Sequence, residues 1–227
     1  MRETSLNLIA ITIFTLTLTA LLGPMFNLSA AIPAGMVFVL LGLATLDTFT
    51  LQGQGSTILV DWLAGTSGQT RDRILHHEAG HFLVAHLLGI PVEGYALTAW
   101  EAFRQGQTAQ GGVRFDDREL MAQLRAGMLS GEAIDKYCKV WMAGIAAETL
   151  LYDHAEGGME DRQKIAALWA QLGRSPREAQ MKQRWATLQA KTLIETHRPA
   201  YDALVEAMAQ RTPATECLQL IADRIRS

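Results

Sequence analysis

The segment His77-Glu78-Ala79-Gly80-His81 has the residue types and the spacing of a metal site that activates water. Residues four apart project from one face of a helix, so the imidazoles of His77 and His81 can bind the same zinc ion. Zinc lowers the pKa of a bound water toward neutrality, and a neighbouring carboxylate accepts the proton as the water attacks a peptide carbonyl. The segment therefore predicts a Zn²⁺ cofactor, Glu78 as the catalytic base, and hydrolysis of an amide bond.

A catalytic zinc ion needs a third protein ligand, and the residues alone do not select it. One known continuation of the motif has a histidine six residues after His81, but Leu87 occupies that position. Cys138 and Cys217 are far apart and form no C-x-x-C pair, so a thiolate site is not indicated. We favour a carboxylate in or beside the loop at residues 157–158. The open candidates are Glu148, Asp153, His154, Glu156, Glu160 and Asp161.

The elements around the motif are expected to be mainly helical. Apolar residues recur at helical spacing over residues 71–88 and Gly89-Ile90-Pro91 provides a stop, which places the motif within a helix with open space at Gly80. Apolar residues on either side of a turn at 105–112 favour a β-hairpin or small sheet. Ser175-Pro176-Arg177-Glu178 is typical of a helix start. Further helices are predicted over residues 120–128, 131–152, 163–172, 175–197 and 201–225, the last interrupted near Thr212-Pro213, with a loop over 153–161.

The N-terminal part of the chain has the composition of a membrane anchor. Two apolar stretches, residues 6–22 and 32–49, are each about long enough to cross a bilayer core of about 30 Å as helices, and the short separator permits only a tight hairpin. A single span, a signal peptide and a buried helical pair are the alternatives. We expect a transmembrane helical hairpin over residues 1–51, then a flexible linker over 52–70. The charged residues of this part are Arg2, Glu3, Asp47 and Asp61.

Charge and motif content exclude two other functions. The formal net charge is −3 and no dense cluster of Lys and Arg occurs, which excludes nucleic-acid binding as a primary role. No Lys follows a Gly, so the phosphate-binding motif G-x-x-x-x-G-K-[ST] is absent and we expect no ATP hydrolysis by this chain. Basic residues are also scarce beside the apolar stretches, so the orientation in a membrane is poorly specified.

Three segments together resemble a known family. His77-Glu78-Ala79-Gly80-His81 matches an H-E-A-G-H motif, Ala143-Gly144-Ile145-Ala146-Ala147-Glu148 is similar to a G-G-R-A-A-E helix, and Gly157-Gly158-Met159-Glu160-Asp161 lies where that family has a Gly-containing loop ending in an aspartate. The family is the FtsH-type zinc metalloproteases. The resemblance implies a zincin-type protease domain over residues 71–227, with Asp161 as the third zinc ligand beside the two histidines.

The same resemblance implies a place for the substrate. Gly111, Gly112 and Val113 correspond to the family's substrate-side strand, where an extended polypeptide is thought to pair with a strand edge. The alternative is a hairpin that only covers the core. Family members place an ATPase module between anchor and protease domain, whereas only residues 52–70 separate them here. The chain is thus similar to ATPase-less relatives of photosynthetic organisms.

We therefore expect a membrane-anchored zinc metalloendopeptidase that hydrolyses peptide bonds of unfolded or membrane-protein segments. Its expected partners are polypeptide substrates and the lipid bilayer, and a homo-oligomer or a separate ATPase partner stays open. The expected location is a bacterial plasma membrane or a thylakoid-type membrane, with the protease domain on the cytoplasmic side. The alternative function is a non-proteolytic membrane factor that binds or assembles partners. His76, directly before the motif, could support the metal site through a neighbouring residue or be an incidental surface residue, and we favour the surface residue.

Overall fold

The fold is mainly helical, and a computed structural model describes residues 2–50, 53–64, 68–106 and 111–226. It contains two compact units, Met1–Thr70 with Thr98–Gly111 and Arg71–Leu97 with Gly112–Ser227. Parts of the expected linker (52 and 65–67) and of the expected turn (107–110) lie outside the described residues. The prediction of a mainly helical chain with a small sheet is confirmed, whereas the zincin-type fold stays a prediction.

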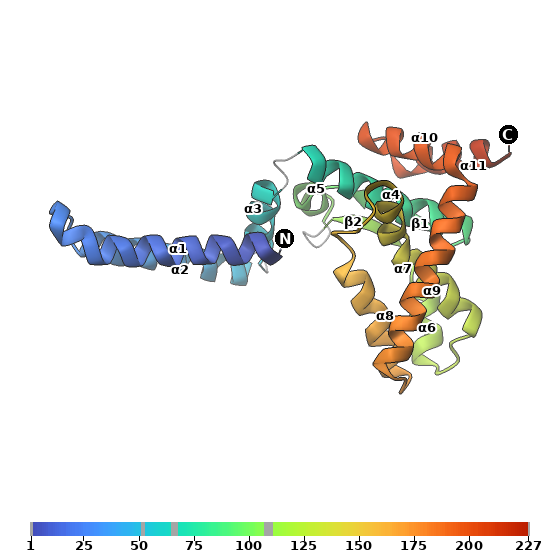
Figure 1. Cartoon of the computed structure of the whole chain (residues 1–227), viewed down its shortest axis with the longest axis horizontal. Helices are drawn as coiled ribbons and strands as arrows, with labels where there is room; N and C mark the ends of the chain where they lie inside the picture. Colours follow the sequence, from blue (N-terminus) through green and yellow to red (C-terminus); the bar gives the residue numbers. More distant parts are fainter. Residues whose placement is uncertain (1, 51–52, 65–67, 107–110, 227) are drawn as a thin grey trace. The chain divides into compact units, whose positions relative to one another are not determined.

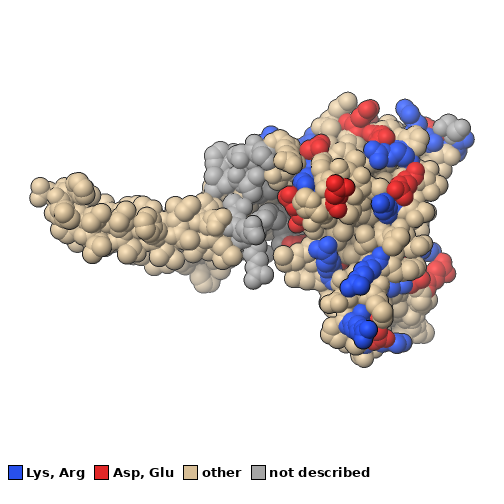
Figure 2. All heavy atoms as spheres, in the orientation of Figure 1, with Lys and Arg blue, Asp and Glu red and all other residues tan. Residues whose placement is uncertain are grey.

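The first unit begins with two long apolar helices, α1 (Arg2–Leu22) and α2 (Ala31–Thr50), joined by the short 3₁₀ helix η1 (Gly23–Phe26) (Figure 1). Their apolar side chains are largely exposed; Phe38 and Phe49 are 79% and 83% exposed. Figure 2 draws this pair almost entirely as uncharged residues, whereas the second unit carries charges of both signs. Both helices are long and apolar enough to cross a membrane, a property that signal sequences and soluble core helices can share.

A helix occupies the middle of the expected linker. This helix, α3 (Gln54–Ala64), begins where the carboxylate of Asp47 accepts hydrogen bonds from the backbone N–H groups of Gly55 (2.8 Å) and Ser56 (2.9 Å). The first N–H groups of a helix have no acceptor within the helix, and a negative group there also interacts favourably with the helix dipole. Asp47 therefore stabilises a helix start in a sequence whose glycines favour a loop.

A short helix, α5 (Ala99–Arg104), also belongs to the first unit and lies between the two segments expected to form a hairpin. Thr98 caps it, because its hydroxyl accepts a hydrogen bond from the N–H of Glu101 (3.1 Å). The connection between the two strands therefore includes a helix that ends just before the expected turn at 105–112.

The helix that carries the motif, α4 (Gly68–Leu87), packs against α7 (Gly131–Tyr152) in the core of the second unit. A Cβ atom at Gly80 would lie 2.6 Å from the carbonyl oxygen of Ala143 and 2.8 Å from Cβ of Ala147. These separations are too short for non-bonded atoms. The open space expected at Gly80 is therefore wrong, because the backbone of α7 fills it.

The small sheet consists of two antiparallel strands, β1 (Val92–Ala96) and β2 (Gly112–Phe115). Tyr95 lies opposite Val113, and the register is irregular near the start of β1. Within the described residues, β2 pairs only with β1, so its other edge is not covered by a strand.

The remaining helices follow the predicted order and differ from the prediction mainly at their ends. They are α6 (Arg118–Arg125), α8 (Met159–Gln171), α9 (Pro176–Thr196), α10 (Arg198–Ala209) and α11 (Ala214–Arg226). α9 lies along α7, where the small side chains of Ala186 and Ala190 are fully buried (Figure 1). Because α8 begins at Met159, Asp161 lies in its first turn and not at the end of a loop.

Replacing Ser175 by Ala should lower the free energy of unfolding by about 1 kcal/mol, because it removes half of a capping box. The Ser175 hydroxyl accepts from the N–H of Glu178 (3.3 Å), and the Glu178 carboxylate accepts from the N–H of Ser175 (2.9 Å). Guanidinium unfolding followed by circular dichroism measures the change. Thr192→Ala, an exposed hydroxyl later in the same helix, is the control and should change stability by less than about 0.5 kcal/mol. Equal effects of the two substitutions would contradict the capping role.

Candidate metal centre

The buried polar and charged residues of the described chain form one connected cluster in the second unit. They are Arg73, His77, His81, Glu148 and Asp161. Moving a charged group from water into a protein interior costs free energy unless the group is paired or binds a metal ion. The concentration of such groups at one place, in an otherwise apolar core, marks the cluster as a candidate functional site.

The two histidines of the cluster have the same orientation. Nδ1 of His77 donates to Oε1 of Glu148 (2.7 Å), and Nδ1 of His81 donates to the backbone carbonyl of Val140 (2.7 Å). An acceptor at Nδ1 keeps the proton on that nitrogen and leaves the lone pair of Nε2 available to a metal ion. Both Nε2 atoms face the same carboxylate oxygen, Oδ2 of Asp161.

The carboxylate of Asp161 completes a group that could hold a metal ion. Its Oδ2 lies 3.3 Å from Nε2 of His77 and 3.4 Å from Nε2 of His81, while Lys164 donates to its Oδ1 (3.1 Å). Atoms about 2.0–2.1 Å from a metal ion at tetrahedral angles lie about 3.3–3.4 Å apart, which matches both separations. The ligand atoms of the three residues all lie within 4.8 Å of one another.

A glycine of α7 makes room for the first histidine. A Cβ atom at Gly144 would overlap the His77 ring, so any side chain at this position would displace the imidazole. Four residues later on the same helix, Glu148 reaches the other side of that ring. Helix α7 thus positions His77 in two ways: Gly144 leaves space for the ring, and Glu148 binds its Nδ1.

Burial opposes charge on both His77 and Asp161, yet each favours the charged form of the other. Burial alone would lower the pKa of His77, but its hydrogen bonds to Asp161 and Glu148 raise the pKa to about 10. Burial alone would raise the pKa of Asp161, but the charge of His81 and the hydrogen bond from His77 hold it well below its usual range. The cluster therefore attracts positive charge, and a metal ion at this group would take the place of the proton on Nε2 of His77.

The carboxylate of Glu78, the residue after His77, contacts strand β2. Its Oε2 accepts a hydrogen bond from the N–H of Val113 (2.8 Å), and a Cβ atom at Gly112 would be 3.6 Å from the same oxygen. The N–H of Val113 therefore points away from β1 and toward α4. Gly111, which precedes β2, has a positive φ of 74°. The role of Gly111, Gly112 and Val113 in substrate binding stays a prediction.

The other candidate ligands do not join the metal-ligand group. The side chains of His154 and Glu156 are 68% and 61% exposed, and Asp153 and Glu160 are exposed as well. Glu148 is buried, but it contacts Nδ1 of His77, whereas Asp161 lies at Nε2 of the same ring.

His76 is not a surface residue, so that prediction is wrong. Its side chain is 16% exposed, its Nδ1 lies 2.9 Å from the hydroxyl of Tyr201, and that hydroxyl donates to the His76 carbonyl (3.1 Å). These contacts join α4 to α10. Arg73 was missed altogether, although a basic residue one turn before His77 on the same helix was visible in the sequence.

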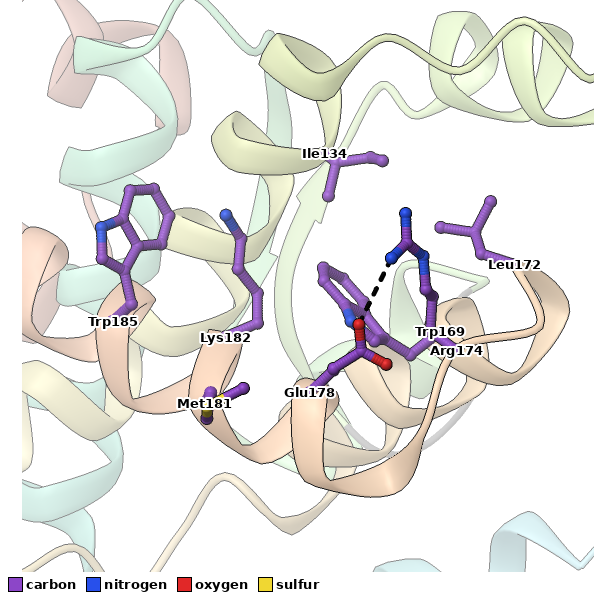
Figure 3. Close-up of a pocket in the computed structure, with 8 residues that line it drawn as sticks. All are labelled: Ile134, Trp169, Leu172, Arg174, Glu178, Met181, Lys182 and Trp185. Atoms are coloured by element: carbon purple, nitrogen blue, oxygen red, sulfur yellow. Dashed lines mark hydrogen bonds and ion pairs between the residues drawn. The ribbon is translucent and has the colours of Figure 1, made fainter.

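A separate hollow of about 420 Å³ lies between α8 and α9 (Figure 3). Trp169 and Trp185 contribute much of its wall, and its charged lining groups are paired: Arg174 with Glu178 (3.3 Å) and Lys182 with Asp135. None of the buried polar cluster lines it. The hollow is thus distinct from the candidate metal centre.

The two thiols should be unreactive in the folded protein. Cys138 and Cys217 are fully buried, and burial raises the pKa of Cys138 to about 12 and that of Cys217 above its ordinary value. Because the thiolate is the reactive form, a thiol-specific reagent should modify neither residue at mildly alkaline pH and both after unfolding, as measured by mass spectrometry. Rapid modification of the folded chain would contradict this burial.

The second unit therefore brings together a buried group that could hold a metal ion, a carboxylate next to its first histidine, and a strand edge beside that carboxylate. The three residues of the metal-ligand group come from two helices: His77 and His81 from α4, and Asp161 from α8. Residues of α7 accept hydrogen bonds from Nδ1 of both histidines. No family model matches the chain, and no curated protein matches it.

Proposed function

We propose that the chain is a membrane-anchored zinc metalloendopeptidase of the FtsH-like, zincin-type class that acts without an ATPase of its own. The proposal is carried by the spacing of the ligand atoms, since Nε2 of His77 and Nε2 of His81 lie 3.3 and 3.4 Å from Oδ2 of Asp161. Three protein ligands leave a fourth tetrahedral position for water, which is the arrangement of catalytic zinc sites. Structural zinc sites have four protein ligands.

The donor atoms favour zinc over the common alternatives. Two imidazole nitrogens and one carboxylate oxygen are typical zinc ligands in metallohydrolases. Magnesium and calcium prefer six or more oxygen ligands, which this cluster does not offer within the described residues. When bound, zinc would polarise a peptide carbonyl and lower the pKa of its water.

Glu78 is the proposed catalytic base. The N–H of Val113 holds its Oε2, so Oε1 is the oxygen proposed to accept a proton from the attacking water and to pass it to the leaving amine. An extended polypeptide is proposed to lie along the uncovered edge of β2, at Gly111, Gly112 and Val113. Main-chain hydrogen bonds at that edge, apart from the N–H of Val113 that Glu78 already holds, would keep the peptide in register beside Glu78.

The apolar helices α1 and α2 are proposed to anchor the chain in a bilayer. Their exposed apolar side chains would be unfavourable in water, and hydrocarbon removes that cost. The proposed location is a plasma or thylakoid-type membrane with the protease domain on the cytoplasmic side. Proximity to the bilayer favours unfolded or membrane-protein segments as substrates.

Cleavage of a permanently unfolded protein by the purified, detergent-solubilised full chain tests this proposal. The assay omits ATP and compares the protein as prepared, after metal removal with a chelator, and after zinc is restored. Cleavage that is lost and regained with zinc supports the proposal. A chain that binds one zinc ion yet cleaves nothing would favour the alternative, a non-proteolytic membrane binding or assembly factor. Cleavage that appears only with an added ATPase would identify a missing partner.

A further inference from the structure

Arg73 lies one helical turn before His77 on α4, on the face that also carries His81. Its side chain is buried, with 7% of the residue exposed. Nη1 donates to Oε2 of Glu148 (3.4 Å) and to the backbone carbonyl of His154 (3.2 Å). The guanidinium therefore reaches both α7 and the loop that follows it.

Stability alone does not explain this arginine. Its guanidinium lies 4.3 Å from the centroid of the Tyr152 ring, but its Nε has no hydrogen-bond partner among the described atoms, and the carboxylate near Nη2, that of Glu156 (3.5 Å), is mostly exposed. A buried charge with incomplete partners costs free energy, and an apolar side chain of similar volume is often neutral or stabilising in its place. A charged side chain at this position is better explained by the groups that Arg73 holds in place.

The carboxylate that Arg73 binds is shared between the first histidine and the loop that leads to α8. Oε1 of Glu148 accepts from Nδ1 of His77 (2.7 Å) and from the N–H of Gly157 (3.2 Å). Oε2 of Glu148 accepts from Arg73 and from the N–H of Glu156 (2.9 Å). Arg73 therefore holds the Glu148 carboxylate in place. That carboxylate orients His77 and also binds the backbone of the loop that precedes Asp161.

We propose that Arg73 is a positioning residue of the metal centre that acts through Glu148. By pairing with Oε2 of Glu148, it directs Oε1 at Nδ1 of His77, which turns Nε2 toward His81 and Asp161. The inference rests on the metal site of the proposed function and not on peptide hydrolysis. Loss of a group that orients a metal-binding histidine lowers metal affinity by about 10–100-fold.

Zinc affinity of Arg73→Met provides the test, measured on the full chain in detergent by competition with a chromophoric chelator. Metal-free protein is first shown to be folded by circular dichroism. We expect zinc binding to weaken by about 10–100-fold. Arg198→Met is the control. Arg198 pairs with a carboxylate (Asp202, 2.8 Å) and lies near the Tyr201 ring, as Arg73 lies near the Tyr152 ring, but it does not contact Glu148 and its side chain is more exposed. Arg73→Lys, which keeps the charge without the planar fork, should lose less affinity and serves if Arg73→Met does not fold.

A double-mutant cycle separates action through Glu148 from a general structural role. In a Glu148→Gln background, Arg73→Met should change zinc affinity by no more than about twofold, because the residue through which Arg73 acts is already altered. Equal losses in both backgrounds, or native zinc affinity in folded Arg73→Met, would overturn the inference. A purely structural arginine would lower stability and leave the zinc affinity of the folded chain unchanged. A native chain that binds no zinc would overturn the proposed function too.

Discussion

Replacing Glu78 by Gln should leave zinc bound and lower the rate of peptide cleavage by about 10²–10⁴-fold. The substitution removes a proton acceptor and no metal ligand. The glutamine carbonyl can still accept the hydrogen bond from the N–H of Val113, so the local structure should be kept. The measurement is kcat/KM on an unfolded fluorogenic substrate, together with zinc content per chain.

The control for this substitution is Glu93→Gln, which neutralises a carboxylate on the neighbouring strand β1. Glu93 pairs with Arg114 (2.9 Å) and both side chains are substantially exposed, so cleavage should change little. Near-native cleavage by Glu78→Gln would place the base elsewhere. Loss of zinc from Glu78→Gln would instead show that Glu78 helps to hold the metal ion.

Replacing Asp161 by Ala should lower zinc affinity by more than about 100-fold, more than the loss of an orienting group, and should abolish cleavage at limiting zinc. The substitution deletes the oxygen that both Nε2 atoms face. It also leaves the Nε2 atoms of two buried histidines without the carboxylate that they face. Zinc binding by chelator competition and cleavage are measured on the same preparation.

Glu160→Ala tests whether this effect belongs to Asp161 in particular. Glu160 lies in the same first turn of α8 but is exposed, so its loss should leave both zinc binding and cleavage near native. If Asp161→Ala bound zinc and cleaved as the native chain does, the assignment of the third ligand would be wrong. Glu148 and Glu156 would then be the next residues to replace.

Local sequence patterns predict those parts of the fold that depend on neighbouring residues. The spacing of His77 and His81 places them on one helix face, and the Ser175–Glu178 box predicts the start of α9, because both interactions span only a few residues. The start of α3 was missed for the opposite reason. Its cap comes from Asp47, at the end of the preceding helix, and no residue within α3 indicates it.

Contacts between distant segments could not be predicted in the same way. The residues alone left six candidates for the third ligand, because Asp161 meets His77 only through the tertiary placement of α8, which packs against α7 and α9. The surface assignment of His76 failed similarly, since its partner Tyr201 is 125 residues away in sequence. Arg73 carries no recognisable motif, and its importance depends on a carboxylate 75 residues later.

The separation of the ligands along the chain has a consequence for folding. His77 and Asp161 are 84 residues apart, so a dication bound by both would act as a cross-link that closes the chain between α4 and α8 into a loop. Closing a long loop restricts the unfolded chain, and a metal site that exists only in the folded state adds its binding free energy to folding. The ion would then stabilise the tertiary structure in addition to its proposed part in catalysis, and the stability of the folded protein would depend on the concentration of available metal ion.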